Sequence, residues 1–179
     1  FSLRPDAEGD QWEPNNPVFL VDWFGARAYC AWEATRAGLP WRLPGELARE
    51  KAARGVDGRF YPWGDNFDPS WACMGKSHQG RILPREVGAF PVDESPYGVR
   101  DMAGSIGGWC LDAFESEGPP LSSARGPGPE APANLAPEAY QGSEYRTIRG
   151  SCWFSAPSFL RAANRDQIGP SDRYNFLGF

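Results

Sequence analysis

RGSCWFSAPSFLRAANRDQIGPSDRYNFLGF, residues 149–179, is the stretch around which this sequence is organised. Rigid or charged positions recur along it, and short groups between them mix aromatic residues with Ser, Asp and Asn. These groups repeat neither every three or four residues, as in a helix, nor every second residue, as in a half-buried strand. Antigen-binding loops favour the same mixture, because aromatic rings supply stiff contact area and small polar residues adapt. The stretch therefore predicts a recognition surface carried by a scaffold.

The scaffold positions of this stretch are the large, charged or conformationally special residues that punctuate it. If the stretch is a binding surface, we expect Trp153 to be buried and the arginines to clamp loop carbonyls or carboxylates through their planar guanidinium groups. Such clamps would let neighbouring side chains change while the backbone stays in place. The predicted framework is Arg149, Gly150, Trp153, Arg161, Asn164, Arg165 and Arg173, with Ala162, Pro170 and Gly178 as further rigid positions.

Composition and charge narrow the classes to which the protein can belong. At 179 residues we expect one domain, spanning 1–179. Hydrophobic content of 41% and charged content of 23% are ordinary for a globular protein. The net charge of −5 argues against a nucleic-acid or anionic-membrane partner, because either would favour a basic patch. The cations are sixteen Arg and two Lys, a bias compatible with a GC-rich genome and with a thermophilic source.

Two observations bear on membranes and secretion. No apolar run approaches the roughly 18 residues of a membrane span, so direct membrane insertion is not expected. The first ten residues, FSLRPDAEGD, carry acids and no apolar core, so no signal peptide is visible. The compartment stays open.

The four cysteines, Cys30, Cys73, Cys110 and Cys152, show no C-x-x-C spacing, which argues against a zinc site. The favoured interpretation is buried or idle thiols, because free Cys packs as a small hydrophobe. The alternative is a bridge between Cys110 and Cys152, since each lies beside a Trp in a strand-like run.

The remaining chain predicts two helices among long irregular segments. Residues 1–16 are interpreted as an irregular arm, and 17–21 as a short buried strand or extended run. Asp22 can cap a helix from Trp23 to about Arg36, ended by Gly38 and Pro40. Its inward face would be Trp23, Ala26, Cys30 and Ala34. We further predict a helix over 43–55, strands over 105–114 and 145–154, and a Pro/Gly-rich surface loop over 116–143.

Three phrases together indicate a family. WRLPGELAREKAARGVDGRFYPWGD (41–65), SPYGVRDMAGSIGGW (95–109) and RGSCWF…RAANR…LGF (149–179) occur in the order and spacing of the formylglycine-generating-enzyme-like, or sulfatase-modifying factor, family. The resemblance covers roughly residues 17–179 and implies an α+β chain with the C-type lectin fold. That fold has two helices, a small twisted antiparallel sheet and long irregular loops.

Departures from the family pattern indicate that catalysis is absent. Formylglycine-generating enzymes bind copper between two cysteines shortly after the RGGS-like strand, and soft thiolates suit Cu(I); here no Cys follows Trp153 in that run. The related iron-dependent enzymes need several histidines, and His78 is the single one. GNVWEW has become GSIGGW, so that Gly107 and Gly108 replace Trp and the Glu that can help bind calcium. RLPTEAEWEKAARG has become RLPGELAREKAARG, which exchanges a capping Thr for Gly45. We expect no catalytic residues, no metal and no cofactor.

The terminal stretch also resembles the variable proteins of diversity-generating retroelements. In those systems adenines in a template are mutated, and AAC codons can become Phe, Tyr, Ser, Asp, Ile or Gly, or remain Asn. Apart from Gln167, the predicted binding positions given at the end of this paragraph hold only such residues. The resemblance implies a variable ligand-binding region over 149–179, with apolar anchors at its centre and polar residues at its rim. The predicted binding positions are Phe154, Ser155, Ser158, Phe159, Asp166, Gln167, Ile168, Gly169, Asp172, Tyr174, Asn175 and Phe176.

The sequence thus predicts a non-catalytic protein that binds an unknown protein or surface ligand. Two alternatives stay open. One is an accessory or sensory domain of a larger protein. The other is a divergent oxidase of the same family, which would use Cys152, His78, Tyr145 or Asp112 in a common pocket.

Overall fold

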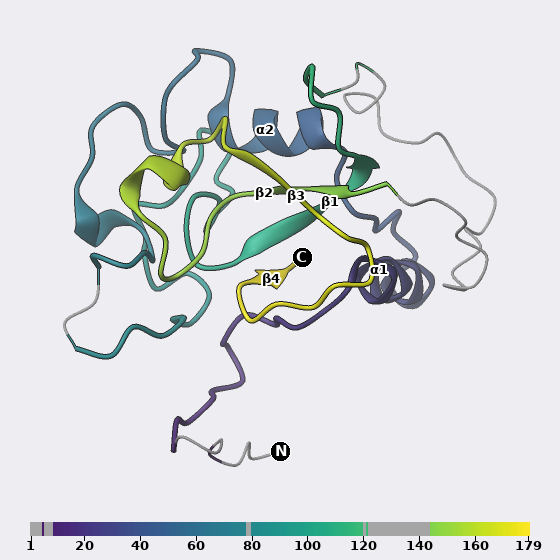
Figure 1. Cartoon of the computed structure of the whole chain (residues 1–179), viewed down its shortest axis with the longest axis horizontal. Helices are drawn as coiled ribbons and strands as arrows, with labels where there is room; N and C mark the ends of the chain where they lie inside the picture. The colour runs from purple at the N-terminus through teal and green to yellow at the C-terminus, as the bar shows by residue number, and fades with distance from the viewer. Residues whose placement is uncertain (1–4, 6–8, 78–79, 120, 122–143) are drawn as a thin grey trace.

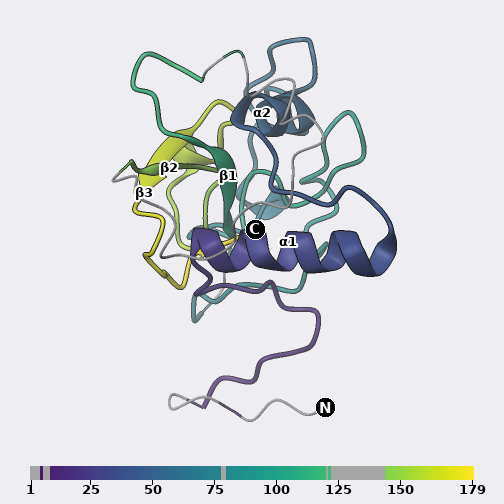
Figure 2. The ribbon, with the colours of Figure 1, turned by 90° about the vertical axis from the view of Figure 1, so that its right-hand side faces the viewer.

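The computed structural model describes residues 5, 9–77, 80–119, 121 and 144–179, and Figure 1 shows the whole chain. Most of the predicted 116–143 loop, His78 and much of the 1–16 arm lie outside the described residues. In both views the two helices lie on either side of a small central sheet (Figures 1 and 2). The elements in chain order are α1 (Trp23–Ala37), α2 (Glu46–Arg54), η1 (Pro69–Trp71), β1 (Gly107–Ala113), β2 (Arg146–Arg149), η3 (Pro157–Leu160), β3 (Arg165–Ile168) and β4 (Leu177–Gly178).

Helix α1 begins and ends where the sequence predicts. The Asp22 side chain accepts the N–H of Gly25, and Gly38 closes the helix in the left-handed conformation. Trp23 and Ala26 are buried, as expected, whereas Cys30 is half-buried. Helix α2 begins at Glu46 and ends at Arg54, within the predicted range.

The sheet has the order β3-β2-β1-β4. β1–β2 and β2–β3 are antiparallel, but β1 and β4 run parallel, so the sheet is mixed rather than wholly antiparallel. The predicted strand over 145–154 ends at Arg149, because Gly150 adopts a left-handed φ of 82°. β3 lies at the edge of the sheet, so one side of its backbone is unpaired within it.

Two tryptophans join α1 to the sheet. The ring nitrogen of Trp23 donates to the Cys110 carbonyl at 2.9 Å, and that of Trp109 donates to the Val21 carbonyl at 2.8 Å. Both indoles therefore bury their rings with the N–H satisfied. They form a core cluster whose buried members are Trp23, Ala26, Leu43, Trp109, Ile148 and Leu177.

The segment 17–21 is not a strand or a continuous extended run, because Leu20 adopts a left-handed φ of 61°, and it is not buried, so its prediction is wrong. Val18 is 66% exposed and Leu20 is 52% exposed. The backbone is what is packed here: a Cβ on Gly178 would come within 2.2 Å of the Val18 carbonyl oxygen. The apolar residues of this segment suggest buried side chains, but the close contact is made by the main chain.

The Cys110–Cys152 bridge is not formed, and all four thiols are free. Gly108 pairs with Arg149 across the antiparallel strands β1 and β2. This register places Cys110 and Cys152 on opposite sides of that pair, so the strands carry the two thiols apart.

Within the described residues, no helix combines the length and apolarity needed to cross a membrane.

Candidate ligand-binding surface

A buried carboxylate lies beneath the terminal stretch. Glu46, the first residue of α2, has no exposed surface and accepts hydrogen bonds from two strands. Arg149 of β2 donates to its Oε1 at 3.0 Å, and Arg165 of β3 donates to both carboxylate oxygens. Thr147 Oγ donates to Oε2 at 3.1 Å. Because Arg149 and Arg165 are register partners, both guanidinium groups reach the same carboxylate.

Arg149 also clamps loop backbone, as the sequence predicts. It is 2% exposed, and its Nη1 donates to the carbonyls of Ala162 and Asn164 at 3.2 and 3.4 Å. Its Nη2 donates to Glu50 Oε2 at 2.7 Å. The five guanidinium N–H groups thus tie α2 to the segment between η3 and β3. Hereafter Glu46, Glu50, Thr147, Arg149 and Arg165 are called the buried frame.

Sequence reasoning missed the acidic half of this frame. Glu46 and Glu50 are four residues apart and therefore share one face of α2. That spacing was the available signal, but it is equally common on solvated helices. Arg165 additionally donates to the Glu115 carbonyl at 2.9 Å, and its hydrogen bonds to Glu46 raise the pKa of its guanidinium.

The other two framework arginines form clamps at the protein surface. Arg173 donates through Nε and Nη2 to Asp22 Oδ2 at 2.9 and 2.6 Å. Arg161 donates to the Ser158 carbonyl at 3.1 Å. The backbone adds to the Arg173 clamp, since the Leu20 N–H donates to the Tyr174 carbonyl at 3.1 Å. The loop between β3 and β4 is thus held against the start of α1.

Four aromatic side chains form a continuous group, called here the aromatic patch: Trp153, Phe154, Tyr174 and Phe176. Phe154 meets Trp153 and Phe176 edge-on, with ring centroids 4.8 and 5.8 Å apart. Tyr174 stacks on Phe176 at 5.0 Å. Phe154 is 46% exposed and Tyr174 is 42% exposed, whereas Phe176 is half-buried and packs against the core. The chain therefore presents aromatic surface to solvent at a place where its backbone is anchored.

Trp153 is half-buried, so the prediction that it is buried is wrong. Its indole N–H donates to the Asn175 carbonyl at 3.4 Å, which joins the two segments of the patch. A ring that bridges two surface segments keeps one face accessible. Its framework role therefore comes from this bridge rather than from burial in the core.

The other predicted binding positions fall into two groups. The exposed group lies on η3, on the edge strand β3 and in the following loop, and consists of Ser158, Phe159, Asp166, Gln167, Asp172 and Asn175. The second group is partly engaged within the protein. Ile168 packs against the core, and Ser155 Oγ lies 2.9 Å from Cys152 Sγ. A Cβ on Gly169 would come within 2.9 Å of the Asp172 carboxylate, so these two positions are coupled.

The residues proposed for an oxidase are not brought together around one reactive group. Tyr145 is 55% exposed, and Cys152 is buried against Ser155. Asp112 Oδ2 accepts the Glu46 N–H at 2.6 Å and so caps α2 from β1, in place of the capping residue lost at Gly45. His78 lies outside the described residues.

Cys73 and Cys152 are buried thiols. Burial raises the pKa of the Cys152 thiol, and it raises that of Cys73 to about 11. Among residues whose placement is described, no group of three or more His, Cys, Asp or Glu side chains could hold a metal ion.

Residues 3–179 match a known family, the sulfatase-modifying factor enzyme 1-like domain. The serine/threonine-protein kinase pkn1 of Chlamydia caviae is 32% identical over 164 residues, which cover 92% of this chain and 23% of the kinase. Hercynine oxygenase of Mycolicibacterium smegmatis is 33% identical over 186 residues, which cover 99% of this chain and 39% of the oxygenase. The chain spans well under half the length of either relative.

Two solved structures have the same fold. PvdO from Pseudomonas aeruginosa superposes with a TM-score of 0.73 at 28% identity, over 95% of this chain and 62% of that one. Treponema denticola variable protein 1 superposes with a TM-score of 0.71 at 21% identity, over 99% of this chain and 76% of that one. The chain therefore has the C-type lectin fold of the formylglycine-generating-enzyme type.

Proposed function

This chain belongs to the family of sulfatase-modifying factor enzyme 1-like domains, and from that premise we propose that it is a non-catalytic binding protein. Its ligand-binding surface would be the aromatic patch together with the exposed residues of η3, β3 and the loop before β4. The sequence of this surface would be diversified by a retroelement, while the buried frame stays fixed. The ligand would be a protein or another macromolecular surface.

One observation carries this proposal: exposed aromatic rings lie on segments whose backbone is held by contacts that do not involve the rings. Phe154 and Tyr174 are both more than 40% exposed, although aromatic side chains are usually well buried. Aromatic residues dominate the binding energy of protein interfaces. Arg173 anchors the loop that carries Tyr174, and backbone hydrogen bonds from Trp153 to Ser105 and from Gly75 to Ser155 anchor the segment that carries Phe154. Side chains can then be exchanged without moving the backbone.

The similarity to Treponema denticola variable protein 1 supports the proposal at the level of the fold. It shows that a protein named as variable uses this scaffold. Enzyme relatives use it too, so the functional argument depends on the residues of this chain.

Population sequencing of the 3′ end of the gene tests the diversification. We expect substitutions at the exposed positions, with Arg149, Arg165 and Arg173 constant, and a nearby reverse-transcriptase gene with a near-duplicate of the terminal coding sequence. A uniform 3′ end, or substitutions spread equally over framework positions, would overturn this part of the proposal.

A second experiment tests the binding scaffold without a known ligand. A library randomises Phe159, Asp166, Gln167, Tyr174 and Asn175, and a matched library randomises the five residues of the buried frame. We expect most members of the first library to resist proteolysis like the parent, because surface changes usually alter stability by less than about 0.5 kcal/mol. The frame library should be degraded. Equal loss in both libraries would mean that the exposed positions serve folding.

The second candidate is a recognition domain within a longer protein. It is favoured by the observation that this chain matches only 23% of the length of the Chlamydia kinase. The genomic test separates the two: an open reading frame that continues into other domains, without a neighbouring reverse transcriptase, favours this candidate.

An enzyme of the same family is tested by metal analysis. Stoichiometric copper or iron in the purified protein, with oxidase activity on a cysteine-containing peptide, would contradict the non-catalytic role.

A further inference from the structure

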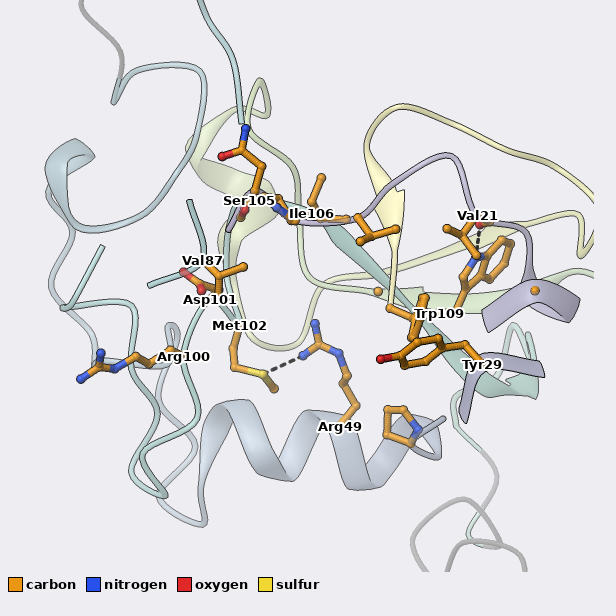
Figure 3. A pocket seen from close by; sticks show the side chains of 17 residues that line it. Val21, Tyr29, Arg49, Val87, Arg100, Asp101, Met102, Ser105, Ile106 and Trp109 are labelled. Atoms are coloured by element: carbon orange, nitrogen blue, oxygen red, sulfur yellow. Dashed lines mark hydrogen bonds between the residues drawn. The ribbon is translucent and has the colours of Figure 1, made fainter. Parts of the chain in front are cut away.

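A cavity of about 770 Å³ lies between α2, the start of β1 and the segment before α1 (Figure 3). Most of its wall is apolar, and the lining includes Val18, Val21, Tyr29, Ile106, Trp109 and Phe179. None of the lining residues belongs to the predicted binding positions of the terminal stretch. The cavity is therefore a separate feature from the aromatic patch.

A single guanidinium group extends from α2 into this apolar space. Figure 3 shows Arg49 between Met102 and Trp109, with its head group toward the cavity. Its Nη1 donates to Met102 Sδ at 3.1 Å, and a thioether is a weak acceptor. Burial lowers the pKa of Arg49, so its surroundings oppose the charge rather than stabilise it. Within the described residues, no carboxylate lies within 4.0 Å of this guanidinium.

The acidic side chains near the cavity accept hydrogen bonds from groups other than Arg49. Asp101 accepts the Gly88 N–H at 2.7 Å, and Glu94 accepts from Arg100 at 2.7 Å. Asp93 attracts Arg49 through space, but its carboxylate accepts the N–H groups of Ala103 and Gly104. Arg149 repels Arg49. In the part of the chain that the structure describes, the positive charge of Arg49 thus has no ion-pair partner, and it lies beside apolar walls.

Two glycines leave space for the guanidinium group of Arg49. A Cβ on Gly108 would come within 3.3 Å of Arg49 Nη2, and one on Gly150 within 3.2 Å. In the family motifs quoted above, Trp stands at the position of Arg49 and Glu at that of Gly108. Small residues around a guanidinium leave its remaining N–H groups accessible from the cavity.

We propose that this cavity binds a small monocarboxylate with an apolar or aromatic body. The carboxylate would pair with the planar guanidinium of Arg49, and the body would lie against Trp109, Ile106 and Val21. A charge-assisted pair away from bulk water is stronger than a neutral hydrogen bond. The volume is within the range of about 300–1,000 Å³ that is usual for small-molecule sites, as is an apolar wall with few polar groups.

Calorimetric titration of the purified protein tests this site with phenylacetate and octanoate as probes. Phenylacetamide, which has the same body without the charge, and inorganic phosphate, which has charge without the body, are the matched controls. We expect both carboxylates to bind at least tenfold more tightly than either control. Arg49→Gln should weaken carboxylate binding at least tenfold without changing binding of the amide, and Arg49→Lys should lie between.

Two further variants keep the test decisive if Arg49→Gln is unstable. Val18→Trp places bulk at the cavity mouth on an exposed residue and should reduce binding of both carboxylates. Val56→Ser, at an exposed residue outside both the lining and the aromatic patch, should leave it unchanged. Absence of saturable carboxylate binding, equal binding of phenylacetamide, equal binding of phosphate, or retention of binding in Val18→Trp would each overturn the proposal. These outcomes are independent of the fate of the terminal binding surface.

Discussion

Arg149 and Arg173 both fasten the terminal stretch to an acidic residue at the start of a helix, but in opposite surroundings. Arg149 is 2% exposed and its partner Glu46 is fully buried. The Arg173 side chain is 64% exposed, and that of its partner Asp22, at the start of α1, is 12% exposed. This difference in burial indicates which of the two contacts contributes more to the stability of the fold. Removing one member of a buried pair leaves an unpaired charge, whereas an exposed pair exchanges its contact for water.

The same contrast in burial distinguishes the buried frame from the exposed residues of the terminal stretch. In the buried frame Arg149 and Arg165 share the carboxylate of Glu46, and Arg149 also donates to Glu50. The surface residues above it, such as Phe159 and Asn175, make no comparable set of contacts among the described residues. Under the proposed function, substitution at the surface would change what is presented to a ligand, whereas substitution in the frame would destabilise the fold.

The largest effect is expected for Glu46→Gln. This change leaves Arg149 and Arg165 buried or half-buried without their shared counter-charge, which should cost about 3–5 kcal/mol of unfolding free energy. Urea unfolding measures it. The matched control is Glu33→Gln on α1, whose partner Arg36 is exposed, and which should cost less than about 0.5 kcal/mol. Similar losses for the two variants would remove the distinction between buried and exposed clamps.

The second largest effect is expected in the pH dependence of stability, through the buried carboxylate of Asp93. Burial raises the pKa of Asp93 to about 6, although it accepts backbone N–H groups from Ala103 and Gly104. Between roughly pH 4 and 6 the folded chain therefore holds a proton that the unfolded chain has released. Stability should fall as pH rises through this window, by about 2–3 kcal/mol for this group.

Chemical unfolding at a series of pH values measures this slope in the parent and in Asp93→Asn. The variant should retain only the weaker dependence that comes from Asp101 and Asp112, whose pKa values burial also raises. If the two pH profiles coincide, the burial of Asp93 has no energetic consequence.

A smaller effect is expected at the cap of α2. Asp112→Ala removes the acceptor for the Glu46 N–H and should cost about 1 kcal/mol, the usual value for a lost N-terminal cap. Asp112→Asn keeps an oxygen acceptor and should lose less. Thermal unfolding ranks the two. A loss for Asn as large as for Ala would assign the effect to the charge of Asp112 rather than to capping.

The smallest effect is expected at the exposed clamp. Arg173→Ala should cost less than about 1 kcal/mol, because both water and salt screen the pair with Asp22. Asp22→Ala should cost more than Arg173→Ala, since Asp22 also accepts the Gly25 N–H that begins α1. If Arg173→Ala is as damaging as Glu46→Gln, the exposed clamp must be placed with the buried frame.

Much of the fold could be predicted from local patterns. The α1 helix lies between a capping Asp22 and a left-handed Gly38, both of which act on neighbouring residues only. The central strand of the sheet, β1, falls within the predicted 105–114 run. The sequence did not reveal that β4 pairs parallel to β1, because two residues carry no periodicity and their partner is distant in the chain.

The candidate site was predictable as a list of positions but not as a surface. Mixed aromatic and small polar residues between arginines are visible in the sequence, and most of those positions are exposed. Ile168 and Phe176 pack partly against the core. The sequence did not show this, because the burial of a side chain depends on which distant element packs against it. The acidic partners Glu46 and Glu50 lie about a hundred residues away from Arg149 and were missed for the same reason.

The sequence alone therefore determined the family, both ends of α1 and the alternation of rigid or charged residues with aromatic and small polar ones, because these depend on residue type and short spacing. Only the tertiary structure decided which carboxylates pair with the arginines, that Trp153 bridges two surface segments, and that Arg49 lies beside an apolar cavity with no carboxylate partner among the described residues. Those features depend on long-range contacts, whose geometry exists only once the chain has folded.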